Sequence, residues 1–232
     1  MKLAIMQPTF LPWPAYFGLI DYVDEFIFLD NVQFDKRSWQ QRNYIISNDK
    51  KNLLTVPVLT KNKLNQSINE VRIDKSSKYI NKHLTSIKMS YSKTDFYKKN
   101  IDEFSDIYNK NYNLLIDLNY NLIQFFLKKM NIKTKLLYAS DLNINEKKES
   151  LINTICMNRK CSEYISPEGS KVYLNKLGKD KMNYQTKFYN FEYSNYTQKS
   201  IKFIKGASIV DVFFNLGDES YPYVAKNFIV KT

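Results

Sequence analysis

Short apolar runs separated by an amphipathic segment dominate the start of the chain. The run at residues 3–6 predicts a buried strand, the segment from about 15 to 23 predicts a helix, and the run at 26–29 predicts a second strand. This order of strand, loop, helix and strand is typical of an α/β sheet. Ligands of such sheets bind beyond the carboxyl ends of the strands, so we expect the functional site at that edge.

Later segments extend the pattern. A hairpin is expected, and Pro57 places its second strand at a sheet edge or at a strand end. A closing segment follows the last predicted helix. The remaining predicted elements are hairpin strands at 44–46 and 53–58 around a turn at 47–50, a short strand at 68–73, strands at 134–138, 164–166 and 188–193, and helices at 146–158 and 208–217.

A long block in the middle of the chain, residues 76 to about 130, has the apolar spacing of three helices. Ser76 or Ser77 is expected to cap the first helix, and the longest helix begins near Leu114. We interpret the block as a helical insertion or lid packed on the sheet. The expected fold is therefore a single α/β domain over residues 1–232, with a central mixed or mostly parallel sheet, flanking helices and this insertion.

Polar residues follow the first two predicted strands. Gln7 comes directly after the first strand and Asp30 directly after the second, so both are expected at the carboxyl edge of the sheet. A stiff aromatic turn containing Pro8, Pro12 and Trp13 leads from the first strand into the helix. We interpret this turn as one wall of a binding pocket. The alternative is that it only covers the edge of the sheet.

Arginine is scarce in this lysine-rich chain, with four residues in 232. Two of them, Arg37 and Arg42, lie in a polar and aromatic loop at residues 31–43. Lysine would suffice for solubility, whereas a planar guanidinium can hold a phosphate or carboxylate with two hydrogen bonds. The loop is therefore a candidate anion-binding segment. The alternative is a surface pair bonded to backbone carbonyls.

The only histidine is His83, at the border of the apolar face of a predicted helix. A lone histidine in this position is often a core or surface residue. It is also the only side chain with an ordinary pKa near neutrality, which makes it a candidate general base. Tyr91, eight residues later, is expected on the same face of the helix.

A second strand followed by a turn is predicted near residue 166. The strand ends at Ser166 and Pro167, Gly169 permits close approach of a backbone or a ligand, and Ser170 is able to begin a helix. Free N–H groups at a helix start suit an anion. Turns of this kind are common before helices, so a structural role is the alternative.

Composition narrows the class of protein. Apolar residues make up 44% of the chain, and no apolar run reaches the length of a membrane span. The formal charge of +12 is scattered among acidic residues, which disfavours nucleic acid as a partner and remains compatible with a phosphorylated substrate. No signal peptide is expected, so Cys156 and Cys161 are predicted to be reduced thiols in the cytoplasm. No metal site and no dinucleotide-binding fingerprint are predicted.

The order of these motifs resembles the WbqC family over nearly the full chain, and the opening motif is the most specific part. Pro14 and Ala15 depart from the pattern, because the family usually has an apolar residue and a glycine there. The matching residues are the run from Met6 to Trp13, Tyr16, Phe17, Leu29, Asp30, Gln33, Arg37, Ser38, Trp39, Arg42, Asn43, the run from Leu54 to Val58, Lys82, His83, Tyr91, Ser166, Gly169, Tyr173, Ser208, Ile209, Asp211, Asn215 and Gly217.

The resemblance implies an enzyme of bacterial O-antigen or other surface-glycan biosynthesis. It would transfer an acyl or aminoacyl group, such as glycyl, to the amine of a nucleotide-linked amino sugar. No cofactor is firmly implied, and an acyl-CoA or another activated donor would supply the group. The expected catalytic residues are His83, as the proton acceptor, and Asp30. Substrate-binding roles are expected for Gln7, Trp13, Gln33, Arg37, Trp39, Arg42, Asn43, Tyr91, Ser166, Gly169 and Tyr173.

Two other classes of function stay open. The turns after Gln7 and Ser166 would suit ATP in an adenylating ligase or a nucleotidyltransferase, although the chain lacks a His-x-Gly-His type motif. A non-catalytic carbohydrate-binding protein would suit the aromatic content of 15%.

Overall fold

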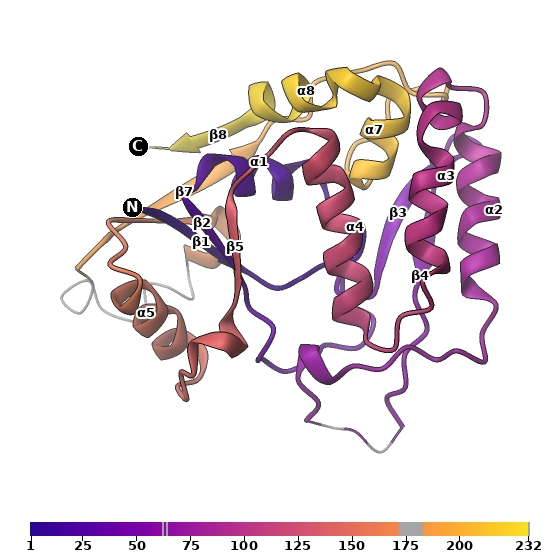
Figure 1. Cartoon of the computed structure of the whole chain (residues 1–232). Coiled ribbons are helices and arrows are strands. Elements are labelled where there is room, and N and C mark those ends of the chain that lie inside the picture. Colours follow the sequence, from indigo (N-terminus) through magenta and orange to yellow (C-terminus); the bar gives the residue numbers. More distant parts are fainter. Residues whose placement is uncertain (62, 64, 172–182, 232) are drawn as a thin grey trace.

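The computed structural model describes residues 1–61, 63, 65–171 and 183–231, and a sheet with helices on both faces lies at its centre (Figure 1). The strands of this sheet are β1 (Lys2–Met6), β2 (Glu25–Phe28), β5 (Lys135–Tyr138), β6 (Glu163–Pro167), β7 (Gln185–Phe191) and β8 (Phe228–Lys231). In the described part of the chain the strand order is β5-β2-β1-β6-β7-β8, and only β8 is antiparallel to its neighbour. The predicted class, a mostly parallel α/β sheet, is confirmed.

Apolar side chains of the central strands alternate between two cores, one on each face of the sheet. In β1, Ala4 belongs to the larger core, which includes α1 (Pro14–Tyr22). Its neighbour Leu3 belongs to the smaller core, which includes α5 (Lys148–Asn158). Burial of both faces explains why β1 and β2 are continuous apolar runs in the sequence.

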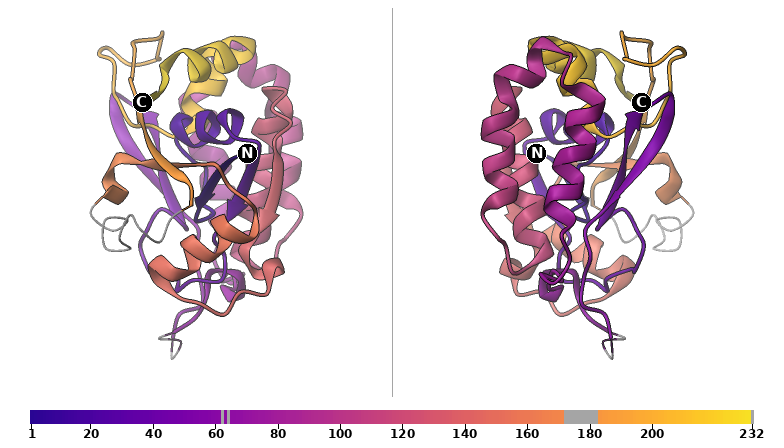
Figure 2. Two further views of the ribbon diagram at one scale, coloured as in Figure 1. Left: turned by 90° about the vertical axis from the view of Figure 1, so that its left-hand side faces the viewer. Right: turned by 90° about the vertical axis from the view of Figure 1, so that its right-hand side faces the viewer.

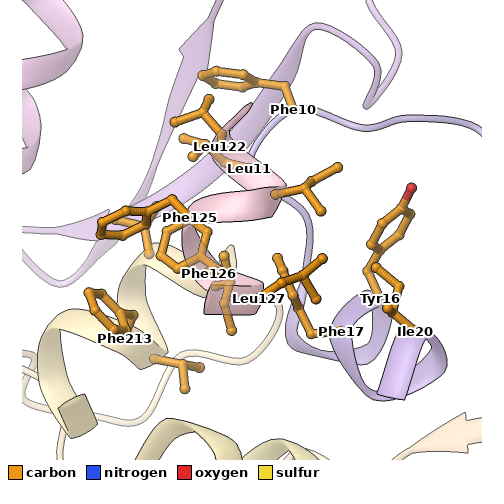
Figure 3. Close-up of a cluster of buried hydrophobic side chains, with 14 of the residues drawn as sticks. Phe10, Leu11, Tyr16, Phe17, Ile20, Leu122, Phe125, Phe126, Leu127 and Phe213 are labelled. Atoms are coloured by element: carbon orange, nitrogen blue, oxygen red, sulfur yellow. The ribbon is translucent and has the colours of Figure 1, made fainter. Parts of the chain in front are cut away.

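A helical block and a separate hairpin complete the larger core. The elements are β3 (Arg42–Ser47), β4 (Lys50–Thr55), α2 (Tyr79–Tyr91), α3 (Asp95–Asn109) and α4 (Leu115–Lys129). Seen from two sides in Figure 2, α2 packs against β3 of the hairpin, and α3 runs next to α2. Phe126 of α4 packs edge-on against Phe17 of α1 at 5.8 Å between ring centroids (Figure 3). The three predicted helices therefore share one core with the sheet, and their description as an insertion stays an interpretation.

The hairpin prediction holds, with shifted bounds. Asn48 and Asp49 have φ values of +48° and +57°, which a two-residue turn of type I′ requires. The second strand ends at Thr55, short of the predicted residue 58, because Pro57 lacks the N–H that would continue the ladder.

Two local predictions are wrong. Residues 68–73 form no strand beyond isolated antiparallel bridges at Arg72 and Ile73. Ile68–Glu70 is a 3₁₀ turn (η1) closed by a capping box between Ser67 and Glu70. The first helix of the block begins at Tyr79 without a side-chain cap. The backbone N–H and the hydroxyl of Ser76 instead donate to Oδ1 of Asp74, at 3.0 and 2.6 Å. In both places a side chain satisfies the nearby backbone locally, and this competes with regular structure.

The end of the chain closes the sheet. It contains α7 (Ile209–Leu216), α8 (Ser220–Asn227) and then β8. Gly18 of α1 allows this closure, because a Cβ at that position would lie 2.7 Å from the Phe228 ring. Among the described residues, no helix combines the length and the apolar character needed to cross a membrane.

Candidate functional site

The strand order reverses between β1 and β6. The chain leads from β1 outward to β2 and β5 on one side, and then crosses to β6 on the other side of β1. In doubly wound sheets, ligands bind in the crevice beyond the carboxyl ends of the strands at such a reversal. Gln7, directly after β1, stands at this point of the edge.

A cavity of about 860 Å³ opens at this edge. We call it the carboxyl-edge cavity. Its volume lies in the range of pockets that hold small molecules, and its wall combines apolar side chains with amides and charges. The described residues that line it are Gln7, Leu29, Asn31, Val32, Gln33, Asn65, Ser67, Glu146, Lys147, Lys148, Leu151 and Ile152.

The amino end of α5 contributes positive potential to the cavity wall. Lys147 and Lys148 lie at the first positions of this helix, and no side chain caps its start. Lys148 has a φ of +54°, a left-handed conformation that a lysine adopts only at some cost. The helix dipole and both ammonium groups favour an anion. Glu146 places a carboxylate next to them.

Gln7 is held by the loop at residues 31–43. Gln40 is buried and donates from Nε2 to Oε1 of Gln7 at 2.9 Å. The backbone N–H of Phe10 donates to the carbonyl of Trp39 at 2.9 Å. Asn43, fully buried, donates from Nδ2 to the carbonyl of Leu11 at 2.8 Å. The stiff turn and the polar loop thus form one unit, in which Asn43 is a structural link.

Asp30 is buried, and its carboxylate ties the end of β2 to the end of β5. It accepts hydrogen bonds from the backbone N–H and the hydroxyl of Ser140, at 2.9 and 2.6 Å. These bonds account for the position of the carboxylate. Asp30 is not among the residues that line the cavity, and its catalytic role stays a prediction.

His83 lies in the larger core, away from the cavity-lining residues. Its Nε2 lies 3.1 Å from the carbonyl oxygen of Thr55, and the rings of Phe10, Tyr79 and Tyr108 surround it at 5.4 to 6.0 Å between centroids. Burial lowers the pKa of His83 to about 4, so the ring is neutral at pH 7. This geometry favours a core histidine, and the catalytic role remains a prediction without structural support.

Tyr91 is also enclosed. Its hydroxyl donates to Oδ1 of Asp211 at 2.8 Å and accepts from the backbone N–H of Ile46 at 3.2 Å. Both bonds are buried, so no part of the hydroxyl faces a ligand. The predicted substrate contact stays a prediction, and the observed role is to join α2, β3 and α7.

The remaining predicted contacts lie in two places. Trp13 and Trp39 pack edge to face at 4.7 Å, and Arg42 is the first residue of β3. Arg37 is exposed in its loop, with a φ of +65°. None of these four residues is a lining residue of the cavity.

The turn after β6 matches its prediction only in outline. Ser166 is buried, and its hydroxyl lies 2.7 Å from that of Ser170. Gly169 lies in a 3₁₀ turn, η3 (Glu168–Ser170), and nothing lies within 4 Å of a Cβ built there, so close approach is not what selects the glycine. Tyr173 falls outside the described residues.

Sequence reasoning found Gln7 and Gln33 in the cavity wall but missed the contribution of α5. The signal was present, since Glu146, Lys147 and Lys148 stand at the start of the helix predicted at 146–158, which follows a predicted strand. The lysine pair is not among the predicted site residues. Its approach to Gln7 depends on where the α5 crossover returns, which local patterns do not show.

Two comparisons with known proteins each cover most of the chain. A sequence model of the WbqC-like protein family matches residues 7–223. The uncharacterized protein Rv1507c of Mycobacterium tuberculosis is 29% identical over 225 residues, which is 96% of this chain and 97% of that protein. No solved structure matches the chain.

Proposed function

The chain belongs to the WbqC-like protein family, and from this premise we propose that it transfers an acyl or aminoacyl group, such as glycyl, to the amine of a nucleotide-linked amino sugar. The reaction would take place in the carboxyl-edge cavity. The observation that carries the proposal is the joint presence, in one cavity at the strand reversal, of two lysines at a helix start and of amide side chains in the cavity wall.

The charges of the cavity suit both parts of such a substrate. Lys147 and Lys148, with the free N–H groups of the first turn of α5, would hold the diphosphate. The amides of Gln7, Asn31 and Gln33 offer donors and acceptors for sugar hydroxyls. The apolar side chains on the wall would exclude water from the reacting atoms.

The chemistry requires a nucleophilic amine, an activated carbonyl and a proton acceptor. The free amine attacks the carbonyl carbon of a thioester donor, the new C–N bond forms, and the C–S bond breaks. The departing thiolate takes the second proton from the amine nitrogen, so the products are an amide and a thiol. The sugar ammonium must first lose a proton. Glu146 is the only carboxylate among the described lining residues, and we assign it the role of proton acceptor. The protein would therefore act as an N-acyltransferase of surface-glycan biosynthesis in the cytoplasm.

The decisive experiment is mass spectrometry of nucleotide-linked amino sugars incubated with the protein and thioester or aminoacyl donors. A product heavier by the acyl group, made by the wild type and not by Glu146→Gln, is the expected outcome. A product that appears only with ATP would instead favour the adenylating ligase. Binding of sugars without any product over the whole donor panel would favour a carbohydrate-binding protein.

Binding is tested separately by thermal shift with UDP-linked amino sugars. Replacing Lys147 and Lys148 together by alanine should abolish the stabilisation by ligand. The matched control is the exposed pair Lys98 and Lys99 of α3, whose double alanine variant should keep it. Equal loss of stabilisation in both double variants would exclude a specific phosphate site at α5.

A further inference from the structure

We infer that the chain carries a second binding surface, on the outer face of the β3–β4 hairpin, for an anionic saccharide. This inference does not depend on the reaction proposed for the carboxyl-edge cavity. We call the surface the aromatic strip. It consists of Trp13, Trp39, Tyr44 and Leu53, together with the cations Arg42 and Lys51.

The alternation of the hairpin separates this face from the core. Asn43 and Leu54 are paired across the strands and are buried toward the core. Their neighbours Tyr44 and Leu53, which are also paired, lie on the opposite face. Leu53 is 37% exposed and Trp39 is 38% exposed, and both exceed what a core side chain shows. A patch of neighbouring exposed apolar groups of this kind often marks a binding site.

The three rings form a continuous series. Trp13 and Trp39 are 4.7 Å apart at 70° between ring planes, and Trp39 and Tyr44 are 5.7 Å apart at 62°. Each ring therefore stands steeply against its neighbour, and the surface is stepped. A pyranose ring, with an apolar C–H face and polar groups around its edge, fits such a surface.

The backbone behind the strip is fixed, so binding would cost little conformational entropy. Pro12 and Pro14 flank Trp13. The carbonyl of Trp39 accepts from Phe10 at 2.9 Å, and the carbonyl of Tyr44 accepts from the N–H of Ser208 at 2.8 Å. Preorganised aromatic side chains of this type are efficient binding elements.

Charge selects the class of saccharide. Nζ of Lys51 lies 5.7 Å from the centroid of the Tyr44 ring, and Arg42 precedes Tyr44 by two residues on the same strand face. None of the six residues of the strip is acidic. A sugar that carries a carboxylate or phosphate complements the two cations, while its C–H face contacts the rings.

The experiment uses a feature of this chain, because its two tryptophans are both in the strip. Tryptophan emission of the full-length protein therefore reports on the strip alone. Trigalacturonate is the anionic probe and maltotriose the neutral one. We expect a saturable change in emission with trigalacturonate and an affinity for maltotriose that is at least about tenfold weaker. No saturable change with trigalacturonate, or equal affinities for the two probes, would overturn the inference.

Variants assign the signal to the strip. Trp39→Phe, followed through Trp13, should bind trigalacturonate about two- to tenfold more weakly, and Lys51→Gln should reduce its advantage over maltotriose. The control is Tyr221→Ala on α8, because Tyr221 is also 38% exposed. Circular dichroism checks folding of each variant. An unchanged affinity in both strip variants, or tighter binding of UMP than of trigalacturonate, would contradict a saccharide site here.

Discussion

Nε2 of Gln40 donates a 2.9 Å hydrogen bond to Oε1 of Gln7 and so joins the turn after β1 to the loop after β2. Gln40 is buried, whereas Gln7 is exposed and lines the carboxyl-edge cavity. The buried amide therefore orients the exposed one. Changes at the two positions are expected to separate stability from ligand binding.

Gln40→Ala should lower the free energy of unfolding by about 1–3 kcal/mol, because the backbone N–H of Asp35 loses its acceptor and Gln7 loses its donor. Gln7→Ala should change stability by less than about 0.5 kcal/mol, as surface substitutions usually do. Both variants should bind a UDP-linked amino sugar more weakly than the wild type. Urea unfolding and calorimetric titration measure the two effects.

The exposed Gln185 at the start of β7 provides the control for Gln7. Gln185→Ala should leave both stability and binding unchanged. If Gln7→Ala binds as tightly as Gln185→Ala does, Gln7 is not part of the binding site.

Local patterns predicted the parallel strands of the sheet, but they did not predict strand β8 and were insufficient for the site. The runs that became β1 and β2 are buried on both faces, so their signal is in the sequence itself. The burial of His83 depends on Phe10 and Tyr108, which contact its ring from segments distant in the sequence. A histidine at the border of an apolar helix face looks the same in the sequence whether its partners are core rings or a substrate.

Glu25, buried at the start of β2, supports a prediction on stability. Arg159 donates to it through Nε at 2.8 Å and a terminal nitrogen at 2.7 Å, and Lys135 donates at 2.8 Å. Arg159→Ala should cost about 3 kcal/mol, because it leaves a buried carboxylate with only an exposed lysine. Arg159→Lys should cost less, since it keeps the charge but loses the two-bond geometry. Thermal unfolding of both variants measures the difference, and equal losses would exclude a role for that geometry.

The pH dependence of this pair follows from the sign of the shift. Hydrogen bonds from Arg159, above all, lower the pKa of Glu25 below its ordinary 4.5. The stabilisation is therefore fully present above pH 4.5 and is lost as the pH falls further. The gap in stability between wild type and Arg159→Ala should narrow in that acidic range. A constant gap down to pH 3 would contradict the assignment.

His83 is expected to cause a second pH dependence of stability, at a higher pH than that of Glu25. Its pKa is lowered by burial from 6.5 to about 4, so the folded state holds a neutral ring that the unfolded chain protonates. Stability is fully present above pH 6.5 and is lost as the pH falls toward 4, by on the order of 3 kcal/mol. Because the chain has one histidine, His83→Gln should remove this slope between pH 7 and 5.

The same variant tests the catalytic alternative for His83. A core role predicts that His83→Gln keeps acyl transfer under conditions where it stays folded. A general-base role predicts that the variant loses turnover. Loss of turnover in a folded variant that keeps the wild-type pH dependence of stability would support the general-base role.

Asp211, in the first turn of α7, is a position where substitution is expected to lower stability strongly. Its buried carboxylate accepts from the hydroxyl of Tyr91 at 2.8 Å, from the hydroxyl of Tyr196, and from Nε2 of Gln198 at 2.8 Å. Tyr196 and Gln198 belong to residues 192–208, a long connection without helix or strand that leads from β7 to α7. The carboxylate therefore attaches this connection to the core.

Asp211→Ala should destabilise the protein by about 3 kcal/mol or more, because the buried hydroxyl of Tyr91 and the half-buried donors of Tyr196 and Gln198 lose their acceptor at once. Asp211→Asn should destabilise the protein less than Asp211→Ala, because its remaining oxygen still accepts from Tyr91. Some loss should remain, because the new NH₂ group faces the NH₂ donor of Gln198. Hydrogen exchange should show faster exchange at residues 192–208 in Asp211→Ala than in the exposed control Asp218→Asn. The attachment is local, so the increase should exceed that of the sheet. A uniform increase over the whole chain would show that Asp211 supports the core as a whole and does not hold this connection in particular.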